Sequence, residues 1–492
     1  MSPHAVSPDY TESSPDHRLV QNGHSNGAPQ SSLLQRSGDD EVADLVCVGF
    51  GPASLAIAIA MHDALEAKDP LVTRRQPKVR FVERQERFAW HAGMLLNGAK
   101  MQITFVKDLA TLRNPRSQFT FLNYLHNKNR LVQFTNLGTF LPQRIEYEDY
   151  MRWCAEHFED AVDYGQDVES VQADRRNSKT GSVESFSVSS LDKRTGRRSV
   201  VKAKHVVIAV GGKPNLPKCL DASHPRVIHS SQYATSIHEI FPARTQPRSV
   251  AVIGAGQSAA EVFNNIPHRF PGCQSHLLIR GAALRPSDDS PFVNEIFDPD
   301  RVDDVYSQDP GIRADGIALD KSTNYGVVRL ELLEEIYSLL YSYRIQYGSE
   351  AEWPHQILSH RSVTGMADNE HDGQPGVRLH IRNETGQYRA NGKSSSEVLD
   401  VDLVVIASGY RRDAHDEMLH EIKDLRAQGS DSSQGWEVNR DYSVKFQEEA
   451  VQRDAGVWLQ GCNEGTHGLS GTLLSILATR GGEMVNNIFN SN

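Results

Sequence analysis

Two glycine-rich turns, far apart in the chain, constrain its fold more than any other feature. Each turn closes a run of strand-forming residues and opens a stretch that can form a helix. The turns are formed by Gly49, Gly51, Pro52 and Ser54, and by Gly254, Gly256 and Ala259. In such turns the first glycine permits a tight bend, the second lets the backbone approach a pyrophosphate, and the helix N-terminus supplies free N–H groups. Two turns in this context predict two dinucleotide sites on Rossmann-like domains.

The residue that ends the next strand of each unit indicates which dinucleotide binds. The first such strand, residues 78–83, ends in Glu83, whose carboxylate can accept both ribose hydroxyls of FAD or NAD. The second, residues 275–280, ends in Arg280, and a guanidinium suits the 2′-phosphate of NADPH. Each residue could instead be a solvated strand end. With the upstream turns, they favour FAD at the first site and NADPH at the second.

Two further apolar runs end in glycine, as buried parallel strands often do. They are residues 205–212 and residues 402–410, the second with Gly409 near its end. Both runs fit an FAD domain, so we expect an α/β protein in which an inserted NADPH domain splits the FAD domain. The expected limits are 41–245 and 401–492 for the two parts of the FAD domain, and 246–400 for the NADPH domain.

Composition excludes several classes of protein. The 492 residues carry a formal net charge of −11 with a pI near 6.0. No basic block appears, so nucleic acid is not expected as a partner. No apolar run approaches the roughly 20 residues of a membrane span, so no membrane association is expected. Residues 1–40 are rich in Ser, Pro, Asn and Gly, which predicts disorder, and their lack of a targeting pattern favours a cytoplasmic location.

The five cysteines are scattered singly, which favours reduced thiols over a disulfide framework. Disulfide reductases share the two-nucleotide architecture, but they need a redox-active cysteine pair beside the flavin, and this sequence contains no such motif. The reducing equivalents must therefore pass to another acceptor, and dioxygen is the obvious one. No metal site is predicted.

Long blocks outside the glycine turns give a more specific signal. The most discriminating blocks, together with the two turns, are GFGPASLA (49–56), KMQITFVKDLATLR (100–113), SQFTFLNYL (117–125), GAGQSAAE (254–261), RPSDDSPFVNEIF (285–297) and HGLSGTLLS (467–475). Through them the chain, from about residue 44 to its C-terminus, resembles the N-hydroxylating flavin monooxygenases. Within that family it is most similar to the fungal L-ornithine N5-monooxygenases of siderophore biosynthesis.

The resemblance implies a fold and a set of site residues. A split FAD domain and an NADPH domain share one cleft, with a small, mostly helical substrate region at residues 285–345. The amino acid would be bound by Lys107 at its α-carboxylate, by Asn294, by Asn324 near the side-chain amine and the nicotinamide, and by Ser470 near the flavin. The cofactors would be bound by Gly49, Gly51, Pro52, Ser54, Glu83, Gln102, Gly254, Gly256, Gln257, Ser258, Arg280, Asn324, Gly409 and Leu469.

The implied activity is N5-hydroxylation of L-ornithine with NADPH and O2, the first step of hydroxamate siderophore biosynthesis. The oxygen would be delivered by a C4a-hydroperoxyflavin, so no protein nucleophile or base is expected. Lysine or a diamine could replace ornithine as the substrate, because one methylene is worth only about 1–3 kcal/mol in a pocket. The chain could also be a plain NADPH oxidase or quinone reductase, or a flavin-binding scaffold without turnover. Relatives of this kind are commonly tetrameric, which implies a homotetramer.

Overall fold

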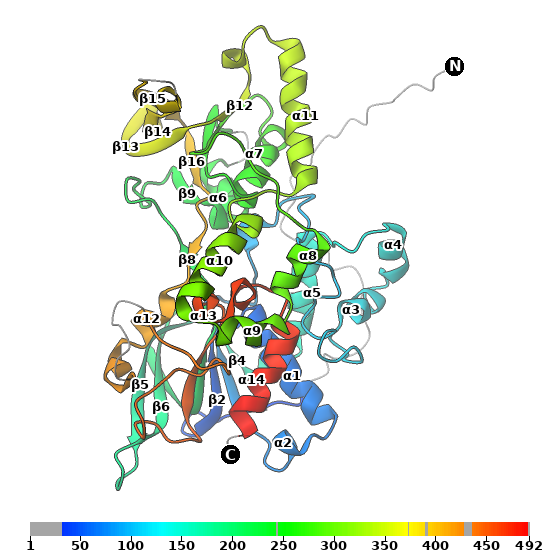
Figure 1. The fold of residues 1–492 in the computed structure, drawn as a ribbon, viewed down its shortest axis with the longest axis vertical. Coiled ribbons are helices and arrows are strands. Elements are labelled where there is room, and N and C mark those ends of the chain that lie inside the picture. The colour runs from blue at the N-terminus through cyan, green and yellow to red at the C-terminus, as the bar shows by residue number, and fades with distance from the viewer. Residues whose placement is uncertain (1–31, 243–244, 372, 389–391, 428–434, 491–492) are drawn as a thin grey trace.

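The computed structural model describes residues 32–242, 245–371, 373–388, 392–427 and 435–490. Two sheets lie toward opposite ends of its long axis, with a group of helices between them (Figure 1). For residues 1–31 the expected disorder falls outside the described residues. It is wrong for Gln35–Arg36, which form a short strand, β1, parallel to the start of β3 (Lys78–Val82).

The strand that leads into the first glycine turn is an inner strand of the first sheet. Besides β1 and β3 this sheet contains β2 (Val42–Val48), β4 (Val162–Asp163), β5 (Gln166–Arg176), β6 (Val183–Asp192), β7 (Arg198–Ile208) and β18 (Gly456–Leu459). The order is β1-β3-β2-β7-β6-β5, with β4 beside β3 and β18 beside β7. Because β3, β2, β7 and β18 run parallel, the segments that follow them emerge at one edge of the sheet.

Two helices pack on each other beside this sheet. Helix α1 (Pro52–Glu66) follows the first glycine turn, and its apolar residues from Leu55 to Met61 are almost completely buried. Helix α14 (Leu477–Asn490) packs on it so closely that a Cβ on Gly481 would stand 2.8 Å from the carbonyl oxygen of Ala56. This contact holds the C-terminal helix against the helix of the first turn.

The second sheet has five strands, all paired in parallel. They are β9 (Val227–His229), β10 (Ser249–Ile253), β11 (Gln274–Leu278), β12 (His355–Leu358) and β16 (Leu403–Ile406), in the order β12-β11-β10-β16-β9. Helix α7 (Gln257–Arg269) follows β10 across the second glycine turn. The two sheets and their glycine turns confirm the predicted α/β class with two Rossmann-like units.

One expectation about the sheets is wrong. The run 402–410, expected in the FAD domain, contains β16, which pairs with β10 in the second sheet. The apolar pattern of a buried parallel strand does not specify its neighbours, so the pattern alone cannot distinguish between the two sheets. The limits of the domains remain predictions.

The chain crosses between the sheets twice, along a two-stranded ribbon. Strand β8 (Lys213–Pro214) pairs antiparallel with β17 (Tyr410–Arg411). The N–H of Asn215 donates to the carbonyl of Gly409 at 2.9 Å. A separate antiparallel sheet, which the sequence did not predict, is formed by β13 (Arg361–His371), β14 (Gln374–Asn383) and β15 (Ser395–Val401).

Residues 291–346 form a mostly helical group, and the limits 285–345 of a substrate region stay a prediction. The group contains α8 (Pro291–Asn294), α9 (Arg301–Ser307), α10 (Pro310–Asn324) and α11 (Leu330–Gln346). In Figure 1, α8, α9 and α10 lie between the two sheets and α11 extends along the second. The part of the chain described by the structure contains no helix that is both long and apolar enough to cross a membrane.

Candidate active site between the two glycine turns

The first glycine turn leaves open space at the start of α1. Gly49 has φ +88°, and a Cβ on it would stand 2.7 Å from the carbonyl oxygen of Ala209, so only glycine fits. Gly51 is the N-cap of α1, no side chain caps the helix, and a Cβ on Gly51 would meet nothing within 4 Å. Pro52 and Ser54 continue into the first helical turn. The helix N-terminus is therefore accessible to a pyrophosphate.

Glu83 lies directly after β3, beside this turn. Its side chain is almost buried, and its Oε2 accepts the N–H of Phe50 at 2.7 Å. Its Oε1 accepts the N–H of Gln85 at 2.8 Å. The two bonds fix the carboxylate, and each oxygen keeps a lone pair that a ribose hydroxyl can use. The structure therefore places Glu83 where the sequence predicted it.

The second glycine turn is covered by the chain that follows α10. Gly254 has φ +146°, and a Cβ on it would stand 2.4 Å from the carbonyl oxygen of Ala407. Gly256 is the N-cap of α7, again without a side-chain cap, and a Cβ on it would stand 3.4 Å from the Cα of Gly326. Because Gly326 comes two residues after Asn324, the end of α10 lies over the second turn.

The predicted NADPH-binding residues follow the second turn. Gln257 begins α7, and its side-chain oxygen accepts the N–H of Arg329 at 2.9 Å. Ser258 follows it and is half-buried. Arg280 lies exposed just beyond β11, which is the parallel neighbour of β10. Arg280 thus stands at the same edge of the sheet as the glycine turn, as a 2′-phosphate ligand requires.

The end of α10 is also bound to the C-terminal part of the chain. The hydroxyl of Tyr325 donates to the Oε2 of Glu464 at 2.5 Å and lies 3.2 Å from the Oγ1 of Thr472. Lys321 forms an ion pair with the Oε1 of Glu464 at 2.6 Å. Burial and the bond to Glu464 raise the pKa of Tyr325 to about 12, so its hydroxyl keeps its proton. These contacts place Asn324 next to the segment that carries Ser470.

Leu469 and Ser470 are buried in the short helical turn Leu469–Thr472. The guanidinium of Arg480 donates to the carbonyl of Gly471 at 2.7 Å. The preceding His467 stacks on Tyr442 at 4.3 Å between ring centroids. Burial lowers the pKa of His467 to about 4, so this ring is neutral near pH 7. Ser470 therefore lies in a tightly supported segment.

Asn294 ends α8, and its side-chain amide donates to the carbonyl oxygens of Asp289 (2.9 Å) and Ser290 (3.2 Å). The next turn, Glu295–Phe297, packs against the turn that carries Ser470. The structure thus brings Asn294, Asn324 and Ser470 onto adjoining segments.

Lys107 and Gln102 lie on the loop between the short helical turn Ala92–Met94 and α3 (Phe121–Asn127). Lys107 is half-buried; its N–H donates to the carbonyl of Thr104 at 3.0 Å, and its carbonyl accepts the hydroxyl of Tyr147 at 3.2 Å. Among the described contacts, none joins Lys107 to the other three amino-acid-binding candidates. Gln102 is exposed. Gly409 lies in the ribbon between the sheets, with φ +78°, and its carbonyl lies 3.1 Å from Nε2 of His229.

The sequence analysis missed three charged residues that link these parts: Arg144, Glu261 and Arg329. Glu261 forms an ion pair with Arg144, and Arg329 contacts both Gln257 and the carbonyl of Met101. A signal for Glu261 was present, because a carboxylate on the buried face of a helix requires a cation. The residues around Arg144 carry no such signal.

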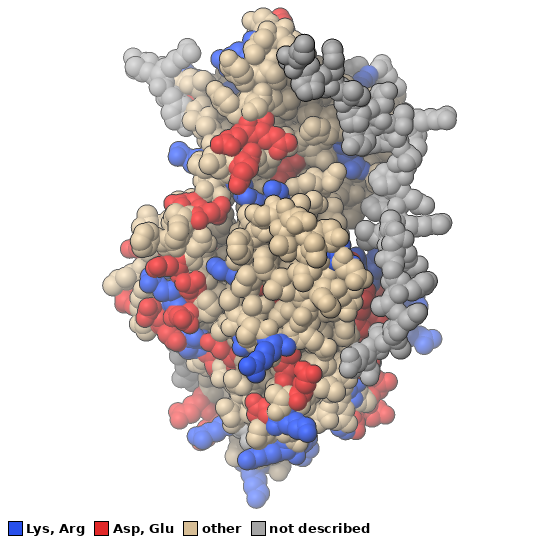
Figure 2. All heavy atoms as spheres, turned by 90° about the vertical axis from the view of Figure 1, so that its right-hand side faces the viewer, with Lys and Arg blue, Asp and Glu red and all other residues tan. Residues whose placement is uncertain are grey.

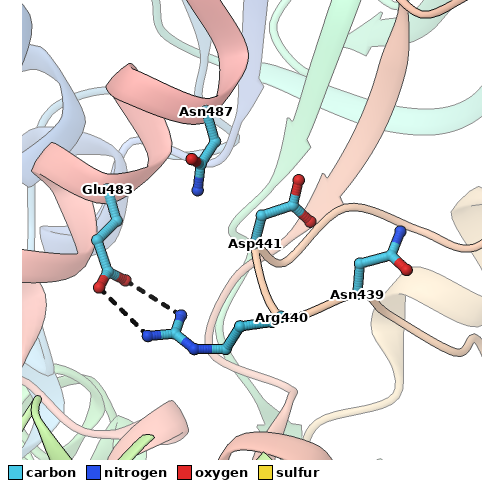
Figure 3. Close-up of a pocket in the computed structure, with 5 residues that line it drawn as sticks. All are labelled: Asn439, Arg440, Asp441, Glu483 and Asn487. Carbon is cyan, nitrogen blue, oxygen red and sulfur yellow. Dashed lines mark hydrogen bonds and ion pairs between the residues drawn. The ribbon is translucent and has the colours of Figure 1, made fainter. Parts of the chain in front are cut away.

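A cavity of about 440 Å³ lies beside the Ser470 segment rather than at either turn. Figure 3 shows Arg440 and Glu483 facing each other in its wall, and they form an ion pair at 3.3 Å. The carbonyl of Arg440 lies 3.1 Å from Nε2 of His467. The backbone of Arg440 thus contacts the segment that carries Ser470, and we assign this cavity no part in binding.

Comparisons with known proteins agree with this arrangement. Residues 41–412 match the family model described as L-lysine 6-monooxygenase/L-ornithine 5-monooxygenase. An L-ornithine N(5)-monooxygenase of Cochliobolus heterostrophus is 53% identical, over 93% of this chain and 88% of its own. One of Aspergillus oryzae is 50% identical, over 93% and 90%.

Solved structures give the same result. The ornithine hydroxylase PvdA of Pseudomonas aeruginosa superposes with a TM-score of 0.79 at 33% identity, over 92% of this chain and 100% of its own. The matches confirm the resemblance seen in the sequence. The chain therefore belongs to the L-lysine 6-monooxygenase/L-ornithine 5-monooxygenase family.

Proposed function

We propose that this protein is an FAD- and NADPH-dependent monooxygenase that hydroxylates N5 of L-ornithine, the first step of hydroxamate siderophore biosynthesis. The observation that carries the proposal is the position of the end of α10. It lies over the second glycine turn through Gly326 and is bonded to the Ser470 segment through Tyr325. A side-chain amine held by Asn324 would therefore lie between the two dinucleotide sites.

The residues of the first turn fit FAD. Gly49 permits the tight bend, Gly51 leaves space at the uncapped start of α1 for a pyrophosphate, and Glu83 presents a fixed carboxylate for a ribose. Pro52 and Ser54 complete the turn, and Gln102 and Leu469 would lie near the flavin ring. Bound FAD, once reduced by NADPH, supplies the chemistry that activates O2 and transfers one oxygen atom.

The residues of the second turn fit NADPH. Gly254 and Gly256 form the turn into α7, where Gln257 and Ser258 would contact the cofactor. Arg280 would bind the 2′-phosphate as a guanidinium donor. The ornithine N-hydroxylase of Kutzneria, described as a complex with reduced FAD, NADP⁺ and L-ornithine, supports this assignment, with a TM-score of 0.79 at 32% identity.

The protein's part in the reaction is to bind, orient and exclude water. Lys107 would pair with the α-carboxylate, and Asn294 would orient the amino acid. Asn324 would hold the side-chain amine, because an amide can bind a neutral amine without stabilising its protonated form. This matters because only the neutral amine is nucleophilic, and an amine of this kind has a pKa of roughly 10.4 in water.

A homotetramer in the cytoplasm is the assembly that the family resemblance implies, and an exposed apolar surface offers a face for it. Helices α3 (Phe121–Asn127) and α4 (Leu131–Asn136), with the loop after them, expose Leu122, Val132, Leu137 and Phe140. Figure 2 views this side and shows a broad central area with few charged side chains. Size-exclusion chromatography with light scattering at micromolar concentration tests the proposal: a tetramer supports it, and a monomer or dimer contradicts it.

An isotope experiment tests the proposed reaction. Purified protein with FAD, NADPH, L-ornithine and isotopically heavy O2 should form a hydroxylamine that contains one heavy oxygen atom. Water carrying the heavy isotope, with ordinary O2, is the control and should leave the product unlabelled. NADPH oxidation that yields only labelled hydrogen peroxide would contradict hydroxylation and favour a plain oxidase.

A further inference from the structure

A buried ion pair joins the first domain to the helix of the second glycine turn. Arg144 begins α5 (Arg144–Glu156), and Glu261 lies in the second turn of α7. The two planar groups meet through two bonds, Nη1 to Oε2 at 2.7 Å and Nη2 to Oε1 at 2.8 Å. Their side chains are only 12% and 6% exposed. A bidentate pair of this kind fixes both distance and direction.

Both members of the pair have further contacts in the cleft. The Nη1 of Arg144 also donates to the carbonyl of Met94 at 2.9 Å. The Oε1 of Glu261 also accepts the side-chain amide of Gln257 at 2.9 Å. The pair therefore connects Gln257, the first residue of α7, with the loop that contains Met94. We call residues 92–107 the flavin-side loop.

A second series of hydrogen bonds connects the start of α7 with the same loop. The side-chain oxygen of Gln257 accepts the N–H of Arg329 at 2.9 Å. The guanidinium of Arg329, which is almost buried, donates to the carbonyl of Met101 at 3.2 Å. Met101 precedes Gln102 in the flavin-side loop. Two chains of polar contacts thus connect residues 94–101 with the start of α7.

We infer that Arg144 and Glu261 are positioning residues that hold the NADPH turn at the correct distance from the flavin. The inference rests on the proposed function. It assigns control of the distance between the two cofactors to residues outside both glycine turns. The second sheet is joined to the first by the ribbon β8–β17, and Met94 and Leu96 pack in the apolar core that β10 and α7 share. The ion pair adds a directed polar contact beside this apolar packing. Transfer of hydride between two cofactors depends steeply on their separation, so a fixed contact at this point controls its rate.

Three variants test the pair. Glu261→Gln keeps the shape but removes the charge, Arg144→Lys keeps the charge but removes the planar fork, and the double variant R144E/E261R exchanges the partners. The matched control is Asp63→Asn, which removes the charge from the buried pair of Asp63 with Arg113 (2.5 Å) within the first domain.

The first measurement is anaerobic reduction of bound flavin by NADPH in a stopped-flow instrument. Glu261→Gln and Arg144→Lys should lower the limiting rate at saturating NADPH by about tenfold or more, and the exchanged pair should recover part of it. Asp63→Asn should stay within about twofold of the wild type. An unchanged limiting rate in both single variants, or an equal fall in the control, would overturn the inference. Failure of wild-type reduction would instead count against the proposed function.

The second measurement does not depend on activity. Backbone hydrogen exchange of the protein without cofactors should speed up in residues 92–101 and in residues 257–263 for both single variants. Asp63→Asn should leave both segments unchanged. Unchanged exchange in both segments in Glu261→Gln and Arg144→Lys would show that the pair does not hold these segments together, and would overturn the inference.

Discussion

Gly256 and Gly326 approach each other closely: a Cβ on Gly256 would stand 3.4 Å from the Cα of Gly326. One residue caps the helix that would receive NADPH, and the other follows the helix that carries Asn324. Their approach places the end of α10 directly over the second glycine turn. Neither residue could be paired with the other from the sequence, because they are separated by α7, β11 and three helices.

Substitution of Gly326 should weaken NADPH binding. Its φ of +70° is unfavourable for alanine by about 1–2 kcal/mol, although a Cβ there would meet nothing within 4 Å. Gly326→Ala should therefore shift the segment over the turn and raise the KM for NADPH several-fold. Gly316→Ala, within α10, is the control and should slightly stabilise the helix. Equal KM values for NADPH in Gly326→Ala and Gly316→Ala would contradict the role given to Gly326.

Substitution of Gly49 should remove the flavin. A Cβ there would stand 2.7 Å from the Ala209 carbonyl oxygen, in addition to the strain of φ +88°. Purified Gly49→Ala should show little flavin absorbance and a lower melting temperature. Gly98→Ala has similar strain at φ +78° without any close contact, so it separates strain from the steric effect. Comparable flavin loss in both variants would show that strain alone is responsible.

Lys107→Ala should weaken amino-acid binding specifically. A hydrogen bond to a charged group contributes about 1.5–3 kcal/mol, which corresponds to roughly 10- to 150-fold in the KM for L-ornithine. The dissociation constant of NADPH should change by less than about twofold. Lys100→Ala, at an exposed lysine of the same loop, serves as the control. An equal loss of affinity for both ligands in Lys107→Ala would show that the assignment is wrong.

The buried His467 should make stability fall in acid. Its pKa is lowered to about 4 in the folded protein, chiefly by burial, against 6.5 for the ordinary side chain. The unfolded chain therefore binds the proton more readily, and stability present above pH 6.5 is lost as pH falls toward 4. Between about pH 7.5 and 5 this one group accounts for about 2 kcal/mol.

Denaturant unfolding at both pH values tests this effect. His467→Gln should lose about 2 kcal/mol less stability than the wild type across the interval, whatever its stability at pH 7.5. Further buried histidines contribute equally to both proteins, so the difference isolates His467. An identical fall in the two proteins would show that the pKa of His467 is the same in the folded and the unfolded chain.

The sequence predicted the features that depend on residues close to one another in the chain. The turns at Gly49 and Gly254 each lie between one strand and one helix, so spacing alone predicted them and the position of Glu83. Two features depend on contacts between distant segments: the sheet to which β16 belongs, and the ion-pair partner of Glu261. The spacing of residues along the chain does not predict such contacts. The β13–β15 sheet is different, because Val377, Leu379 and Ile381 alternate with exposed residues, and this alternation is itself a sequence signal for a half-buried strand.

The most direct test of the proposed function is the amount of hydroxylamine formed per NADPH consumed, with L-ornithine and L-lysine compared in air. The proposed function predicts nearly one product molecule per NADPH with ornithine, and predominantly peroxide with lysine. Equal or better coupling with lysine would contradict the substrate assignment. NADPH consumption with peroxide alone for both amino acids would contradict hydroxylation itself.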